Sequence, residues 1–105
     1  MTEKIAVLST AGSVEEAGRI ARHLVDRRVA ACVNIVAGAR SVYRWKGNIE
    51  EAEEWLLIIK TRRVLFEQLQ VELKSVHSYE VPEIIALPVV EGSQPYLDWL
   101  TEETS

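Results

Sequence analysis

Residues 41–60 read SVYRWKGNIEEAEEWLLIIK, and this stretch decides the fold. Residues 41–45 have the aromatic and β-branched character that is typical of a strand. Lys46-Gly47-Asn48 is a turn sequence, and residues 49–60 begin acidic and end fully apolar, as a second strand. Because only a short loop separates the two segments, the stretch predicts an antiparallel β-hairpin.

The first strand of this hairpin extends backwards along the chain. Residues 29–36 are apolar, and the run is interrupted at Gly38 before it resumes at Ser41, so we expect one long strand with a bend or bulge at the glycine. Strands usually have about five or six residues, so this one is long. Its distal half, which carries Tyr43 and Trp45, is expected to project beyond the core. An exposed aromatic strand pair is an aggregation hazard unless another surface covers it, so the hairpin predicts self-association.

The chain before the hairpin predicts a strand and a helix. Residues 4–10 are a short apolar run closed by a turn, which is typical of a buried strand. Ser13 and Glu16 then have the spacing of a capping box, with Ser13 as the N-cap and the Glu16 carboxylate bonding back to it. Apolar residues at helical spacing follow, and we expect this helix to end at Arg28.

The chain after the hairpin predicts a helix, a strand and a second helix. Thr61 is placed as the N-cap of a helix over 62–76, whose buried stripe consists of Phe66, Leu69, Leu73 and Val76. Residues 84–90 predict an apolar strand, and Pro88 favours an edge position because proline has no N–H for a ladder hydrogen bond. A short C-terminal helix is expected to begin at residues 93–95.

The order strand, helix, strand, strand, helix, strand, helix indicates an α+β protein. Its first six elements match the split βαβ arrangement of the ferredoxin-like fold, an antiparallel sheet with helices on one face. We expect residues 1–105 to form a single domain with a long central hairpin and a C-terminal helix. A sheet covered by helices on one face needs a partner or polar residues on the other, which again favours an oligomer.

Composition narrows the function. The chain has 105 residues and a net charge of −4, which argues against a general nucleic-acid binder and against a surface held on anionic lipid. The single cysteine, Cys32, cannot form an internal disulfide, and no signal peptide or apolar run long enough for a membrane span is present in the sequence. We therefore expect a cytoplasmic protein.

The segment from His77 to Glu83 contains the candidate site. It carries His77, Tyr79, Glu80 and Glu83, and Pro82 fixes its geometry. Histidine and carboxylate side chains are common metal ligands and acid–base groups, so His77, Glu80 and Glu83 are candidate metal ligands. The alternative is a hydrogen-bonded corner at a subunit contact, and a metal site here would need further ligands, for example from a neighbouring subunit.

Residues outside this segment allow similar pairs of interpretations. Cys32 lies among apolar residues, which favours a core position over a soft-metal contact. Tyr43 and Trp45 are interpreted as interface residues, because large aromatics are enriched at the centres of interfaces. Lys60 could bind an anion if a cleft forms between subunits, where it would form a pocket of mixed polarity with Tyr79 and Glu80.

The acidic cluster at residues 50–54 is interpreted as a solvated strand edge rather than as a metal site. Strand alternation sends its neighbouring side chains to opposite faces, so few of them can share one ion. We expect a solvated edge, with Arg40 or Arg44 as ion-pair partners across the hairpin. The cluster consists of Glu50, Glu51, Glu53 and Glu54.

The sequence offers little for catalysis. It has one cysteine and two histidines, and it contains no glycine-rich phosphate loop or recognisable nucleophile–histidine set. We therefore do not expect an enzyme, nor a required cofactor.

Several spaced motifs make the chain resemble the CutA divalent-cation-tolerance family nearly from end to end. These motifs are AACVNI (30–35), SVYRWKGNI (41–49), KT (60–61), HSYEVPEI (77–84) and YLDWL (96–100). The resemblance implies a ferredoxin-like homotrimer, similar in architecture to the PII signalling proteins, with sheet edges joined between subunits. It also implies a link to tolerance of copper and other divalent cations.

The copper ligands associated with this family match the chain at one position of three. The family's cysteine falls on Ser9, its first histidine on Val76, and its second histidine on His77. A hydroxyl and an isopropyl group do not replace a thiolate and an imidazole as copper ligands. We expect a trimer that takes part in the response to divalent metal ions and binds copper or another divalent cation weakly near His77. The alternative is a PII-like small-ligand sensor or trimeric scaffold without a metal role.

Overall fold

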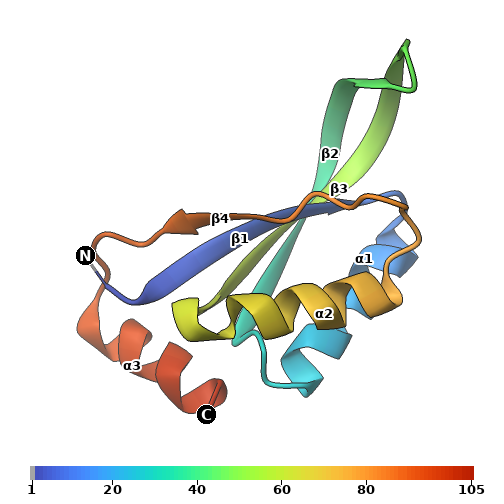
Figure 1. Cartoon of the computed structure of the whole chain (residues 1–105). Helices are drawn as coiled ribbons and strands as arrows, with labels where there is room; N and C mark the ends of the chain where they lie inside the picture. Colours follow the sequence, from blue (N-terminus) through green and yellow to red (C-terminus); the bar gives the residue numbers. More distant parts are fainter. Residues whose placement is uncertain (1) are drawn as a thin grey trace.

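Four strands form one antiparallel sheet in the order β2-β3-β1-β4 (Figure 1). The computed structural model describes residues 2–105. β1 (Lys4–Ala11) is an inner strand that pairs with β3 (Asn48–Arg62) on one side and with β4 (Ile85–Pro88) on the other. β2 (Cys32–Trp45) pairs only with β3 among the described strands, so β2 and β4 are the two edges.

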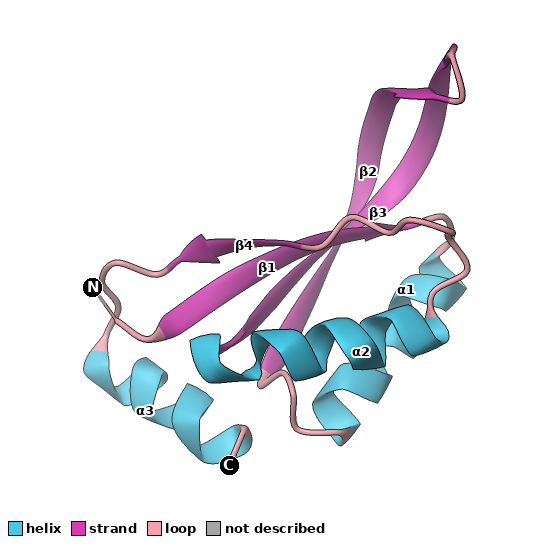
Figure 2. Ribbon diagram, in the orientation of Figure 1, coloured by secondary structure: helices cyan, strands magenta, loops and turns pink. Residues whose placement is uncertain are grey.

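Two helices lie side by side against one face of this sheet (Figure 2). They are α1 (Val14–Asp26) and α2 (Phe66–Val76), and the 3₁₀ turn η1 (Arg63–Leu65) leads from β3 into α2. α3 (Gln94–Glu103) packs near one end of the sheet through Leu97 and Leu100. The element order and the antiparallel sheet confirm the predicted α+β, ferredoxin-like fold.

The core lies between the sheet and the two helices α1 and α2. The predicted stripe of α2 is confirmed, because Leu69 and Leu73 are fully buried and Phe66 and Val76 pack against the same cluster. Burying an aliphatic side chain of this size contributes about 1.5–3 kcal/mol. The fully buried members from the other elements are Val7, Ala11, Ala17, Ile20, Leu24, Leu57 and Ile59.

The long hairpin has the predicted shape. Its register shifts between Val36 and Ala39, and Gly38 between them has a φ of +87°, which is the bulge expected at this glycine. Lys46 and Gly47 both have positive φ (50° and 86°), the backbone of a type I′ turn that suits the twist of a tight hairpin. The distal part of β2 and β3 extends away from the rest of the chain, as Figure 1 shows.

Thr61 does not cap a helix, and that prediction is wrong. β3 continues to Arg62 and α2 begins only at Phe66. The Thr61 side chain is fully buried, and its hydroxyl donates a hydrogen bond of 2.7 Å to the carbonyl oxygen of Val29. The apolar alternation of the strand therefore continues through Thr61, and the hydroxyl stabilises the turn between α1 and β2.

Three predicted elements have bounds shifted by a few residues, and one of them is β2, which begins at Cys32 rather than Val29. α1 ends at Asp26 rather than Arg28, because Arg28 has a φ of +59° and leaves the helix. β4 covers Ile85–Pro88 rather than the longer run, and Pro88 closes this edge strand, as its missing N–H requires. No helix of the described residues is long and apolar enough to cross a membrane.

The sheet face opposite α1 and α2 is largely apolar along β1 and β4, with Lys60 and Asn34 as a polar pair toward β2. Side chains alternate along a strand, so Leu8 of β1 faces away from the buried Val7, and the register places Ile58 and Ile85 beside it on that face. Leu87 is next to Ala6 on the same face and is half exposed. An apolar sheet face without a covering helix is the surface that the predicted partner subunit would cover.

Candidate functional site

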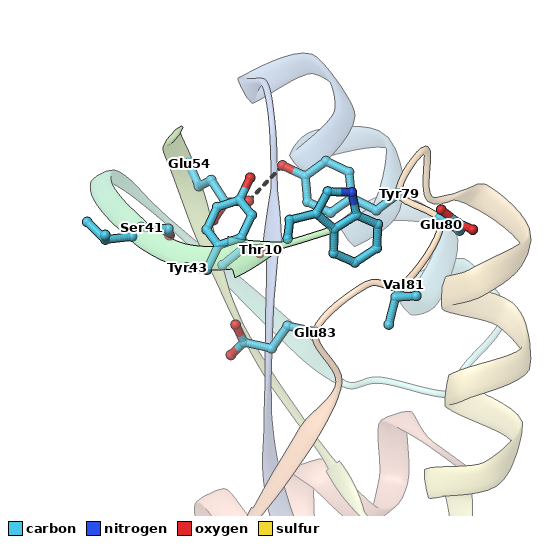
Figure 3. A pocket seen from close by; sticks show the side chains of 10 residues that line it. Thr10, Ser41, Tyr43, Glu54, Tyr79, Glu80, Val81 and Glu83 are labelled. Atoms are coloured by element: carbon cyan, nitrogen blue, oxygen red, sulfur yellow. Dashed lines mark hydrogen bonds between the residues drawn. The ribbon is translucent and has the colours of Figure 1, made fainter. Parts of the chain in front are cut away.

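A hollow of about 690 Å³ lies between the projecting hairpin, β1 and the loop that follows α2 (Figure 3). It brings together segments that are far apart in sequence. Its lining residues are Thr10 from β1, Ser41, Val42, Tyr43 and Trp45 from β2, Glu54 from β3, and Tyr79, Glu80, Val81 and Glu83 from the loop. The volume is in the range of small-molecule pockets, about 300–1,000 Å³.

The pair Tyr79–Glu54 forms one wall of this hollow. The Tyr79 hydroxyl donates a hydrogen bond of 2.6 Å to Glu54 Oε2, drawn as the dashed line in Figure 3. Burial raises the pKa of Tyr79, and the hydrogen bond and negative charge of Glu54 raise it further. Tyr79 is therefore the donor over the physiological pH range, and it fixes the loop to β3.

The prediction that all four glutamates of the hairpin are solvated is wrong for Glu54. Its residue is only 6% exposed, whereas Glu50, Glu51 and Glu53 are exposed. Glu54 lies opposite Ala39, directly after the bulge, where the hairpin passes the loop and Tyr79 covers it. For the exposed members, Arg40 Nη2 lies 4.0 Å from Glu51 Oε1, which agrees with the expected ion pair across the hairpin.

His77 is a buried corner residue whose two ring nitrogens both have protein partners. Nε2 lies 2.7 Å from the carbonyl oxygen of Thr10, and Nδ1 accepts the backbone N–H of Tyr79 at 3.1 Å. These partners require the neutral tautomer that carries its proton on Nε2. The side chain is fully buried, and its ring packs on Tyr79 with centroids 4.6 Å apart.

The carboxylate of Glu16 lies behind this corner. It accepts the backbone N–H of Ser78 at 2.7 Å and lies 3.7 Å from His77 Nδ1. Burial by itself raises the pKa of Glu16, but the hydrogen bonds from Ser78 bring it below its usual value. The predicted capping box is therefore half right, because Ser13 Oγ accepts the Glu16 N–H at 3.1 Å while the carboxylate binds the loop.

Gly12 allows Tyr79 to reach Glu54. A Cβ atom at Gly12 would lie 3.1 Å from the Tyr79 hydroxyl, which is closer than nine in ten such contacts in proteins. A side chain at this position would require the Tyr79 hydroxyl to shift by a few tenths of an ångström. The turn after β1 therefore shapes the hollow as well as connecting β1 to α1.

The predicted metal ligands His77, Glu80 and Glu83 share one loop, but only Glu80 and Glu83 line the hollow. Among residues 2–105 no three His, Cys, Asp or Glu side chains are close enough together to hold one ion. His77 would have to give up a hydrogen-bond partner to bind a metal. Metal binding at these residues stays a prediction.

The copper ligand set implied by the family resemblance does not fit this chain. Ser9 is fully buried, and its Oγ is the one buried side-chain oxygen or nitrogen without a hydrogen-bond partner in the described residues. A serine hydroxyl is a poor ligand for copper compared with a thiolate, and Val76 offers no ligand atom. Together with the occupied nitrogens of His77, this leaves no preformed copper site at these positions.

Lys60 and Cys32 lie away from the hollow. The Lys60 ammonium donates to the Asn34 side-chain oxygen, and Cys32 is the residue paired with Lys60 across β2 and β3. Cys32 is partly buried rather than a full core residue. Burial is the main cause that raises the pKa of Tyr96, and the neighbouring Cys32 raises it further. Within one chain, Lys60 therefore does not form a pocket with Tyr79, whereas Tyr43, Trp45 and Tyr79 do line one hollow.

Sequence reasoning did not place Thr10, Glu16 or Glu54 at this site. Glu54 directly precedes the apolar run of β3, so the start of that run was a signal that this carboxylate is close to the core. Glu16 fits the capping-box pattern, so its sequence position gave no reason to expect a contact with the loop. For Thr10, which contributes its carbonyl oxygen, no side-chain pattern could give a signal.

The sequence of this chain matches a known protein family and individual proteins of similar sequence. Residues 5–103 match the family model described as CutA1 divalent ion tolerance protein. The chain is 52% identical over 98 residues to the divalent-cation tolerance protein CutA of Thermus thermophilus, covering 93% of this chain and 95% of that protein. It is 46% identical over 99 residues to protein CutA of Homo sapiens, covering 94% of this chain but only 55% of the human protein.

Solved structures agree with this comparison. The divalent cation tolerance protein (Cut A1) from Thermus thermophilus superposes with a TM-score of 0.94 at 50% identity, covering 97% of this chain and 99% of that one. The periplasmic divalent cation tolerance protein CutA from Archaeoglobus fulgidus gives a TM-score of 0.94 at 41% identity, with the same two coverages of 97% and 99%. The likeness therefore includes the projecting hairpin as well as the sheet and helices.

Proposed function

Because the chain belongs to the CutA1 divalent ion tolerance family, we propose that it acts in divalent-cation tolerance as a cytoplasmic homotrimer without catalytic activity. In this proposal it binds divalent metal ions weakly at the loop after α2. The observation that carries the metal role is the pair of exposed carboxylates, Glu80 and Glu83, on a loop held rigidly by His77 and Tyr79.

The chemistry of this loop favours a weak oxygen site over a tight copper site. Carboxylates are hard ligands that suit ions such as Mn²⁺, and residues 77–84 contain no thiolate or thioether that would select soft Cu⁺. Two carboxylates leave most coordination positions to water or to groups from a second subunit. The imidazole of His77 contributes by holding the loop in place through Thr10, rather than by contacting the ion.

The homotrimer is supported by three surfaces of the chain. The projecting hairpin exposes apolar side chains, with Val42 65% and Ile49 68% exposed. The strands β2 and β4 are both open sheet edges among the described residues, and the sheet face with Leu8 and Ile58 is not covered by α1 or α2. Edges and apolar faces of this kind are stabilised by pairing with another chain.

Calorimetric titration with Mn²⁺ and Cu²⁺ tests the metal role. The purified protein is first stripped with a chelator, and the double variant Glu80→Gln, Glu83→Gln is compared with the parent. We expect the Mn²⁺ affinity of the double variant to fall at least about tenfold, because two hard oxygen charges are removed. Glu67→Gln, which removes an exposed carboxylate on α2, is the control and should leave the affinity unchanged. Equal affinities for all three proteins would reject metal binding at this loop.

A second candidate function is the ligand sensor, and the hollow itself favours it. A cavity of about 690 Å³ that combines aromatic and polar lining residues is typical of a small-ligand site. The sensor considered from the sequence would take an anionic metabolite through Lys60. The hollow is lined by three glutamates and by no lysine, arginine or histidine, so an anion is the wrong charge for it.

A further inference from the structure

We propose that the hollow beside Tyr79 binds an aliphatic diamine or polyamine. This inference does not depend on metal binding by the chain. It depends on the chemistry of the lining, which combines two kinds of side chain. Three are aromatic, Tyr43, Trp45 and Tyr79, and three are acidic, Glu54, Glu80 and Glu83.

The aromatic side chains suit the body of such a ligand. Aromatic faces attract an ammonium group and also pack against methylene groups, so they bind both parts of an alkylamine. Figure 3 shows the Tyr43 and Tyr79 rings on opposite sides of the Tyr79–Glu54 hydrogen bond. The chain gives an internal example of the same attraction, because the Lys46 ammonium lies 5.7 Å from the centroid of the Trp45 ring.

Within one chain, the acidic side chains of the hollow are spaced for an extended cation, and a divalent ion on Glu80 or Glu83 would need further oxygens from water or a second subunit. A bare divalent ion needs several oxygens at about 2.3–2.6 Å from one point. The described acidic residues offer no such group of three. In Figure 3 the Glu83 carboxylate points toward the hairpin, while Glu80 lies at the opposite rim, so the negative charges are spread along the hollow. Ammonium groups separated by methylenes can reach carboxylates that are spaced in this way.

The wall of the hollow is already ordered without a ligand. Tyr79 is fixed through its hydroxyl to Glu54 and through its backbone N–H to His77. The buried Glu54 carboxylate uses one oxygen for Tyr79 and has lone pairs left to accept an ammonium N–H. Binding therefore costs little reordering of these side chains, which favours affinity.

Isothermal titration with 1,4-diaminobutane, at neutral pH and low salt on chelator-treated protein, tests the proposal. The neutral analogue 1,4-butanediol has the same chain length and also hydrogen-bonds, but it carries no charge. We expect saturable binding of the diamine at one site per chain, and affinity for the diol at least about tenfold weaker. No saturable heat with the diamine, or equal binding of diamine and diol, would overturn the proposal.

Three variants locate the site. Glu83→Gln and Trp45→Leu should each weaken diamine binding by about three- to tenfold, because each removes one attraction for the ammonium groups. Glu67→Gln removes the same charge as Glu83→Gln from an exposed position outside the hollow, and it should bind the diamine like the parent. Thermal melting of each variant checks that it is folded. If Glu83→Gln is folded and binds like Glu67→Gln, the amine site is not in this hollow. A loss of metal affinity in the double variant Glu80→Gln, Glu83→Gln without loss of diamine affinity would reject the amine proposal alone.

Discussion

Glu16 and Glu54 are both carboxylates buried under the loop that carries His77 and Tyr79. Each accepts a hydrogen bond from that loop, one from a backbone N–H and one from a hydroxyl. Hydrogen bonds to a charged group are worth about 1.5–3 kcal/mol, more than neutral ones. At the scale of single residues, the loop is therefore held by two charge-assisted hydrogen bonds, one to α1 and one to β3.

Glu16→Gln should destabilise the protein at neutral pH by about 1–3 kcal/mol, because it weakens the bond to Ser78. The folded-state pKa of Glu16 lies below the usual value of 4.5, so its charge stabilises the fold above that value. This contribution is lost as the pH falls through the folded-state pKa. Urea unfolding at pH 7 and at pH 3 should therefore show a smaller difference between parent and variant at pH 3.

Glu15→Gln is the matched control for that experiment. Glu15 lies in the same first turn of α1 and is exposed, so both variants lose the same favourable interaction with the helix dipole. Only Glu16 also binds the loop. Equal destabilisation by the two variants at pH 7 would show that the bond to Ser78 contributes nothing measurable.

Tyr79→Phe should cost about 1–3 kcal/mol of unfolding free energy, because it leaves the buried Glu54 carboxylate without its hydroxyl donor. Tyr43→Phe removes a hydroxyl from a tyrosine that is 44% exposed, and it should change the stability by no more than about 0.5 kcal/mol. Chemical denaturation of both variants measures the difference. A Tyr79→Phe protein as stable as the parent would contradict the assigned role of the hydrogen bond.

At the scale of elements, the hairpin is the feature that shapes the site. The bulge at Gly38 re-aims β2 and β3, so that residues on both strands face the loop after α2. The turn at Lys46 and Gly47 fixes the register of the distal part. A shift of one residue in that register would exchange the two faces and remove Tyr43 and Trp45 from the hollow.

Two glycine substitutions should change stability in opposite directions. Gly47→Ala places a side chain on a backbone with a φ of +86° and should destabilise the protein by about 1–2 kcal/mol. Gly18→Ala lies inside α1, where an added Cβ meets no atom within 4 Å, and it should stabilise by about 0.5–1 kcal/mol. Melting curves of the two variants measure this. The same sign for both would contradict the assignment of a type I′ turn.

At the scale of the whole molecule, the fold leaves apolar surface without a covering element. β1 and β3 present Leu8 and Ile58 on the face away from α1 and α2, and Leu87 of β4 extends that face to the sheet edge. The hairpin adds a further apolar surface outside the core. We expect a trimer in which each chain covers these apolar surfaces on the next, because this removes them from water.

Sedimentation equilibrium at micromolar concentration should therefore give about three times the chain mass of 11.9 kDa. Leu87→Glu introduces a charge on the open sheet face and should lower the observed mass. Val71→Glu places the same charge on the outer side of α2, where valine is already 67% exposed, and it should leave the mass unchanged. A monomeric parent protein would reject the trimer.

The sequence by itself determined the elements and their order. Periodicity, the glycine at the bulge and the proline in β4 are local signals, because they act through the backbone of neighbouring residues. The end of β3 was misjudged, since Thr61 satisfies an N-cap pattern, yet its hydroxyl has a better partner in Val29, far away in sequence. Local patterns cannot show such a partner.

Only the tertiary structure decided the site. Sequence reasoning found His77 and Tyr79, but it did not show that Glu54 and Glu16 lie beside them. Tyr79 and Glu54 are 25 residues apart in sequence, and Ser78 and Glu16 are 62 residues apart. The chain brings them together through strand register, the bulge and the packing of α1, which together determine the face on which each carboxylate lies. The residue types that carry the chemistry are written in the sequence, whereas their grouping depends on long-range packing.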